Sequence, residues 1–163
     1  MSYKDFQAFT AENCQGYKKI FEISIGGFLY LVFLPDAYHK ILCISSDYIS
    51  IIDSENGQVT PIDGDYDEVE LVAMCEGYDS PIPIAGQYGG SLPLDNGKDV
   101  RVTMDTDQSE EYPILTIYWE KDKEDRSQIY KSYLPYIFGF SPDGQYYVHA
   151  DDGGLTVLKR NSH

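Results

Sequence analysis

The chain has 163 residues, of which 42% are hydrophobic, and its 12 Lys and Arg against 27 Asp and Glu give a formal net charge of −15 at pH 7. A surface of this sign repels nucleic acid and anionic membranes, so we expect neither as a direct partner. There is no apolar run of about 18 residues, and the polar N-terminus lacks the apolar stretch of a signal peptide, which together predict a cytoplasmic protein without a membrane-spanning helix.

The N-terminal segment is the strongest helix candidate in the chain, and we predict a helix over residues 1–16. Phe6 and Phe9 are three residues apart, as on one face of a helix, and Gly16 is a suitable end. A second, shorter helix is predicted over residues 123–134, where apolar residues recur four positions apart.

Most of the remaining sequence has the composition of β-strands. Segments rich in β-branched and aromatic residues alternate with Gly, Pro, Asn and Asp clusters, and the Asn-Gly pairs at residues 56–57 and 96–97 are typical of hairpin turns. We therefore predict a mainly β fold, with antiparallel, blade-like sheets around one core at residues 20–160, within a single domain of residues 1–163. The predicted strands are FEISI, FLYLVFL, KILCIS, YISIID, QVTPI, EVELVAM, DVRVTM, ILTIYW and QYYVHA.

Two segments share a pattern that starts with F-x-P-D. VFLPDAYHKILCISSDYISIID and GFSPDGQYYVHADDGGLTVLK each continue through a strand, a short polar turn and another apolar strand. Over residues 33–53 and 140–159 this pattern resembles a blade of the WD40-type and related β-propellers. The resemblance implies blade-like sheets. A four-bladed propeller is the less favoured alternative, because the copies lie 107 residues apart, which is not a whole number of blades of about 40–45 residues.

No motif for nucleophilic catalysis is present, and we predict that the protein is not an enzyme. Cys43 and His39 are four residues apart, but a Cys–His pair is defined in space and not by such spacing. We expect His149 to be a packed or surface residue and the three cysteines to be free thiols. No cofactor is expected, because the sequence has neither a phosphate-binding loop nor a C-x-x-C pair.

The acidic segment DGDYDEVE contains the one weak candidate for a metal site. Asp63, Asp65 and Asp67 alternate as at the start of an EF-hand calcium loop, but Glu68 and Met74 stand where that loop requires Gly and Glu. On a strand the three carboxylates would point to one side and repel each other, which favours weak cation binding. A small-ligand or Ca²⁺-binding β domain is therefore the alternative function.

The stretch between Lys40 and Lys98 is the clearest indication of function. It contains no Lys or Arg and eleven Asp and Glu, although its apolar segments allow it to fold. Solubility alone would explain such acids, whereas tyrosines among them are typical of protein-binding surfaces. The predicted partner-binding residues are Asp47, Tyr48, Asp63, Asp65, Tyr66, Asp67, Glu68 and Glu70.

The favoured hypothesis is a non-enzymatic protein-binding module whose acidic face meets a basic protein. Electrostatic steering would accelerate association, and tyrosines would provide the buried contacts. In its most concrete form the chain is an immunity-type inhibitor of bacterial origin. It would cover the active site of a basic toxin, such as a nuclease, encoded by an adjacent gene.

Overall fold

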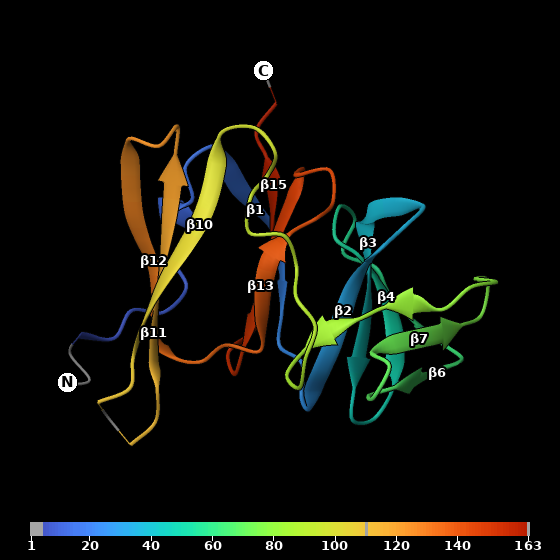
Figure 1. Ribbon diagram of the computed structural model, residues 1–163. Coiled ribbons are helices and arrows are strands. Elements are labelled where there is room, and N and C mark those ends of the chain that lie inside the picture. Colours follow the sequence, from blue (N-terminus) through green and yellow to red (C-terminus); the bar gives the residue numbers. More distant parts are fainter. Residues whose placement is uncertain (1–4, 110, 163) are drawn as a thin grey trace.

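The computed structural model describes residues 5–109 and 111–162, and it consists of four antiparallel sheets packed in a row (Figure 1). Sheet 1 contains, in spatial order, β5 (Val59–Ile62), β4 (Ile49–Asp53), β3 (Ala37–Ser45), β2 (Phe28–Leu34) and β9 (Ala85–Gly86). Sheet 2 contains β6 (Gly64–Asp67), β7 (Val72–Cys75) and β8 (Ile82–Pro83). Sheet 3 contains β10 (Val100–Asp107), β11 (Ile114–Lys121) and β12 (Asp125–Tyr133). Sheet 4 contains β1 (Tyr17–Ile23), β15 (Gly154–Arg160), β14 (Tyr146–Asp151) and β13 (Ile137–Phe140).

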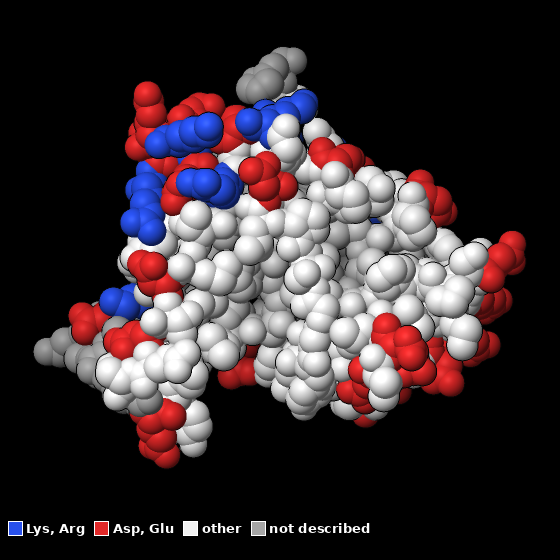
Figure 2. All heavy atoms as spheres, in the orientation of Figure 1, with Lys and Arg blue, Asp and Glu red and all other residues white. Residues whose placement is uncertain are grey.

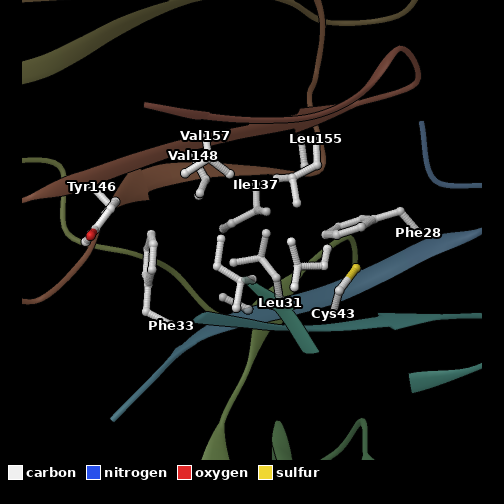
Figure 3. Packing of buried hydrophobic residues seen from close by; sticks show 13 residues of the cluster. Phe28, Leu31, Phe33, Cys43, Ile137, Tyr146, Val148, Leu155 and Val157 are labelled. Atoms are coloured by element: carbon white, nitrogen blue, oxygen red, sulfur yellow. The ribbon is translucent and has the colours of Figure 1, made fainter. Parts of the chain in front are cut away.

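The prediction of a mainly β fold with antiparallel sheets is therefore confirmed. Sheets 1 and 4 share the central cluster of buried apolar side chains, in which Leu31 and Phe33 of β2 pack with Val148 and Val157 of sheet 4 (Figure 3). Burial of these side chains against each other removes apolar surface from water, which is the main source of stability for such an arrangement. The sheets thus cover one another face to face.

Each central sheet also packs on an outer sheet through its second face. Trp119 of sheet 3 packs with Phe140 and Tyr147 of sheet 4, and Ile44 of sheet 1 packs with Ala73 of sheet 2. The spatial order of the row is therefore sheet 3, sheet 4, sheet 1 and sheet 2. A strand that is buried on both faces needs no polar alternation, which explains why YYVHA in β14 is buried throughout.

The row has two ends, at sheets 2 and 3, as Figure 1 shows. A four-bladed propeller would require these two sheets to pack on each other as well. Within residues 5–109 and 111–162, no core cluster joins sheet 2 to sheet 3. The observed arrangement is an open row of four antiparallel sheets.

Both F-x-P-D segments lie at the same place in their sheets, at the turn between two antiparallel strands. The first joins β2 to β3 and the second joins β13 to β14, and each pair is followed by a third strand of the same sheet. In the second turn the hydroxyl of Ser141 donates to the carboxylate of Asp143 and accepts the N–H of Tyr146. Gly144 has φ of 74°, which L-residues rarely adopt. The strand–turn–strand pattern of both segments is confirmed, and the wider likeness to propeller blades stays a prediction.

The helix predicted over residues 1–16 is wrong for the part that the structure describes, since residues 1–4 lie outside it. Gln7 forms an antiparallel bridge with Lys131, and a single turn of 3-10 helix covers Ala11–Asn13. The cause is tertiary packing. The ring of Phe9 stacks on the ring of His149, with the ring centroids 4.5 Å apart, and this contact holds the segment in an extended conformation.

None of the helices in the described ranges has the length and apolar character needed to cross a membrane.

The second predicted helix, over residues 123–134, is also wrong. The segment forms β12, which pairs with β11 along its length. Neighbouring Ile129 and Tyr130 are both buried in the cluster shared with sheet 4, because Ile129 is the extra residue of a β-bulge opposite Ile117 and Tyr118. Pairing with β11 therefore outweighs the local helix preference.

Asn96 connects sheet 4 to the turn that precedes β10. Its side-chain oxygen accepts hydrogen bonds from the main-chain N–H groups of residues 98–100 at 2.9 to 3.0 Å. Its Nδ2 donates to the Tyr17 hydroxyl at 3.0 Å and to the Asp99 carboxylate at 2.9 Å. The Tyr17 hydroxyl in turn donates to the carbonyl of Gly144. One buried amide thus links β1, the β10 turn and the second F-x-P-D turn.

We predict that Asn96→Ala lowers the free energy of unfolding by about 3 kcal/mol, because several buried donors and acceptors lose their partner. The matched control is Asn56→Ala in the other Asn-Gly pair. Asn56 is exposed and its side-chain oxygen accepts one hydrogen bond, from the N–H of Gln58. Its loss should cost less than about 1 kcal/mol. Denaturant unfolding measures both, and equal losses would contradict the linking role of Asn96.

Candidate functional site

The outer face of sheet 2 is open to solvent and carries the predicted aspartates. Ala73 of β7 faces sheet 1, so the alternation of the hairpin directs the side chain of Asp65 to the other side. Asp65 pairs with the exposed Met74, and the N–H of Glu76 donates to the carbonyl of Asp63 at 3.1 Å. Carboxylates and one apolar side chain therefore share this face.

Tyr66 is one of the predicted binding residues whose side chain does not lie on the outer face. It pairs with the buried Ala73, and its half-buried ring packs 6.0 Å from the ring of Tyr30 in β2. A residue between two outward aspartates on a strand must point inward. Tyr66 therefore helps to attach sheet 2 to sheet 1.

The turn between β6 and β7 presents an apolar side chain among acids. The Asp67 carboxylate accepts the main-chain N–H groups of Val69 and Glu70 at 2.8 and 3.0 Å, which fixes the turn. Leu71 completes it with φ of 56°, a conformation that costs an L-residue about 1–2 kcal/mol. Val69, at the tip, is 89% exposed. The turn therefore holds Val69 in water, and the sequence pattern gave no sign of it.

Glu68 connects the same turn to the core. Its carboxylate accepts a hydrogen bond from the Tyr30 hydroxyl at 2.7 Å, and Tyr30 is fully buried. Burial, and then the bond to this carboxylate, raise the pKa of the Tyr30 phenol to about 12. The phenol therefore stays a proton donor at neutral pH and holds Glu68 in place.

The turn between β3 and β4 brings two more predicted residues to the surface. Asp47 is exposed there, and Tyr48 is 54% exposed. Ile49, the first residue of β4, pairs with Ile62, the last residue of β5. The β3–β4 turn and the start of β6 therefore lie at the same end of sheet 1. We call the outward residues of sheet 2 and of these two turns the acidic face. It consists of Asp47, Tyr48, Asp63, Asp65, Asp67, Val69, Glu70, Met74 and Glu76, whereas the carboxylate of the predicted Glu68 is directed to Tyr30.

Positive charge is almost confined to the other half of the molecule. In Figure 2, Lys and Arg gather at the upper left, over sheets 3 and 4, while Asp and Glu line the right edge, over sheet 2. Two acids of the stretch between Lys40 and Lys98 form ion pairs: Asp53 pairs with His39, and Glu55 pairs with Lys159. The carboxylates of the acidic face have no ion-pair partner in the described part of the chain.

The three aspartates that were weak candidates for a metal site do not converge. The Asp65 carboxylate accepts the N–H of Tyr66 at 2.8 Å, and the Asp67 carboxylate is held by the β6–β7 turn. Among the described residues, no group of three or more His, Cys, Asp or Glu could hold a metal ion. Alternation along β6 spreads the carboxylates along the strand instead of gathering them around one point.

The cysteines and His149 are buried in the core, and His39 is half-buried. All three cysteines are free and buried, and burial raises the pKa of Cys43 to about 12, so its thiol stays protonated at neutral pH. His149 is also buried, and its Nε2 lies 2.9 Å from a carboxylate oxygen of Asp151. His39 lies 3.7 Å from the carboxylate of Asp53. These histidines pair with acids and not with a nucleophile.

The structure also contains an apolar groove that the sequence analysis missed. It has a volume of about 580 Å³ and lies between β2, the segment of residues 78–85 and the segment of residues 91–93. One signal in the sequence could have indicated it: Pro81 and Pro83 alternate in PIPIAG. Proline donates no hydrogen bond to a neighbouring strand, and it therefore marks the place where a sheet stops.

No known protein family, curated protein or solved structure matches the chain. The acidic face and the groove must therefore be interpreted from their own geometry and chemistry.

Neutralising carboxylates of the acidic face should stabilise the fold, because unpaired like charges on neighbouring strands repel each other. We expect Asp63→Asn with Glu70→Gln to raise the melting temperature by about 1–3 °C at low salt. The gain should shrink at high salt, where the repulsion is screened. Asp99→Asn is the control, since this carboxylate binds Arg160 and Asn96 and its loss should lower the melting temperature. A decrease in the double variant would show that the face is built for stability.

Millimolar Ca²⁺ should raise the melting temperature no more than NaCl of equal ionic strength, because Asp63, Asp65 and Asp67 do not surround a common point. Differential scanning fluorimetry with the wild type and with Asp63→Asn/Asp65→Asn tests this. A shift of several degrees that is specific to Ca²⁺ and lost in the double variant would contradict it.

Proposed function

We propose that the chain is a non-enzymatic protein-binding module whose acidic face receives a basic protein. The observation that carries the proposal is the set of exposed carboxylates without ion-pair partners on this face. Intramolecular pairing would have used such charges for stability, whereas unpaired charges of one sign create a field that attracts a basic surface. The cations on sheets 3 and 4 make the field directional (Figure 2).

Exposed apolar side chains on the same face support a binding role. Tyr48, Val69 and Met74 are 54%, 89% and 57% exposed, and all three lie among the carboxylates. Interfaces commonly combine a few apolar or aromatic anchors with a charged surround that steers the encounter. The acidic face has both parts. Exposure of these three apolar side chains to water is unfavourable, and contact with a partner would bury them.

We further propose that the partner is a toxin, such as a nuclease, and that the chain is its immunity-type inhibitor. A nuclease active site carries positive charge because it binds phosphates. An acidic face with the exposed Val69 in its turn has the charge to meet such a site. The buried thiols and paired histidines favour a chain that acts by binding and not by catalysis. In this form of the proposal the protein acts in the bacterial cytoplasm, and its gene lies next to the gene of the toxin.

The decisive experiment is co-expression with the product of the adjacent gene, followed by association kinetics at 50 and 300 mM NaCl. Asp63→Lys/Glu70→Lys should lower the association rate constant about tenfold at the lower salt concentration, since steering depends on these charges. The matched control, Asp105→Lys/Asp125→Lys, changes the net charge equally at exposed positions of sheet 3, and it should change the rate less than about threefold.

Three results would overturn the proposal. The first is the absence of a complex at 50 mM NaCl. The second is equal slowing in the two charge-reversed proteins, and the third is a complex that leaves the partner's activity intact. Melting temperatures of both variants within a few degrees of the wild type would show that the rates report binding and not unfolding.

A further inference from the structure

The groove forms where the chain passes from sheet 2 to sheet 1. Ile82 and Pro83 pair with β7, and the N–H of Ile84 donates to the carbonyl of Leu71 at 3.0 Å, so this segment belongs to sheet 2. β9 then pairs with β2 no further than Leu31. From Val32 onward, the edge of β2 lies beside the groove and not beside a strand.

The main chain of Phe33 faces this groove. The N–H of Gln87 donates to the carbonyl of Leu29 at 2.8 Å, which places the main-chain groups of Leu29 on the β9 side of β2. Main-chain groups alternate between the two edges of a strand, so those of Leu31 and Phe33 point to the same side. Beyond the end of β9, the amide and carbonyl of Phe33 therefore meet the groove, which Phe33 lines. An open strand edge of this kind is a template for another strand.

The walls of the groove are mostly apolar, and Ile82 and Leu92 are among the residues that line it. Its hydroxyl side chains are those of Tyr38, Tyr78, Ser80 and Ser91. Five prolines also line it and supply no main-chain N–H, so the edge of β2 is where main-chain pairing with an occupant can form. These prolines are Pro35, Pro81, Pro83, Pro93 and Pro142.

The charge around the groove is negative. Asp79 lines it and is exposed, and Asp36, at the adjoining β2–β3 turn, accepts a hydrogen bond from the Tyr78 hydroxyl at 2.9 Å. None of the described residues that line the groove is Lys or Arg. Cationic side chains at the ends of an occupant would therefore be attracted, and acidic ones repelled.

We propose that this groove binds an extended protein segment, which adds to the edge of β2 as a new antiparallel strand. The segment has apolar side chains that enter the groove and Lys or Arg at its ends. This inference rests on the proposed function for the source of the segment, which is the basic partner. Main-chain pairing with an exposed edge plus pockets for alternate side chains is a recognised mode of peptide binding. A small apolar molecule would leave the amide and carbonyl of Phe33 without partners.

The probe is a fluorescein-labelled peptide of sequence KVTVTVK with an amidated C-terminus, and fluorescence anisotropy measures its binding to the full chain. We expect saturable binding that weakens about tenfold when glutamates replace both lysines, because of the acids at the rim. Equal binding of the two peptides would overturn the predicted charge preference.

A pair of N-methylated peptides tests strand addition itself. Methylation of one central amide removes a donor that faces β2, while methylation of the next amide removes one that faces away. We expect one of the pair to lose at least about tenfold in affinity and the other to bind as the parent does. Equal affinities would overturn strand addition and show that apolar contact alone holds the peptide.

Variants of the protein place the binding in the groove. Ser91→Trp fills it from the wall formed by residues 91–93, and we expect at least a tenfold loss of peptide affinity. Thr60→Trp is the control, since Thr60 is exposed on β5 at the other edge of the same sheet. It should bind the peptide normally. Equal affinity of both variants would place the peptide elsewhere and overturn the inference.

The outcomes distinguish the groove from the acidic face. Peptide binding that is insensitive to Ser91→Trp, together with an intact complex with the adjacent-gene product, overturns the groove and leaves the proposed function standing. Peptide binding that is sensitive to Ser91→Trp, without any such complex, supports the groove and overturns the proposed partner.

Discussion

Burial of both faces of sheets 1 and 4 is the constraint on which the rest of the structure depends. The central cluster between them uses one face of each sheet, and sheets 2 and 3 cover the opposite faces. A strand in such a position can carry almost no charge, because an unpaired charge in the interior costs several kcal/mol. The acids of this acidic chain are therefore driven to the outer sheets and to the turns, where the acidic face forms.

Much of the fold follows from local sequence, and the parts that do not have a specific cause. Strand composition predicted β2, β3, β4 and β11, because central strands must be apolar and β-branched whatever their partners. The N-terminal helix failed because the position of Phe9 depends on His149, which lies 140 residues further along the chain. The helix over residues 123–134 failed for a similar reason, since pairing with β11 determines its conformation.

The candidate site divides in the same way. The acids between Lys40 and Lys98 could be found from the sequence, because the absence of bases is a property of the chain itself. The inward position of Tyr66 and the exposure of Val69 depend on which face of β6 meets sheet 1 and on the turn after Asp67. The groove was harder to predict from the sequence, because it forms where β9 stops pairing with β2. Pairing between strands that are distant in the sequence has no local sequence signal.

The pairing of β1 with β15 joins Tyr17 near the start of the chain to Arg160 near its end. During synthesis from the N-terminus, β1 therefore remains unpaired on this edge until the segment of β15 has been made. Until then, sheet 1 has no partner for the face that forms the central cluster. Long-range strand pairing of this kind slows folding, and the waiting strands have open edges that other chains could join. Charge repulsion between copies of the acidic segment that follows β5 would oppose such joining during that interval.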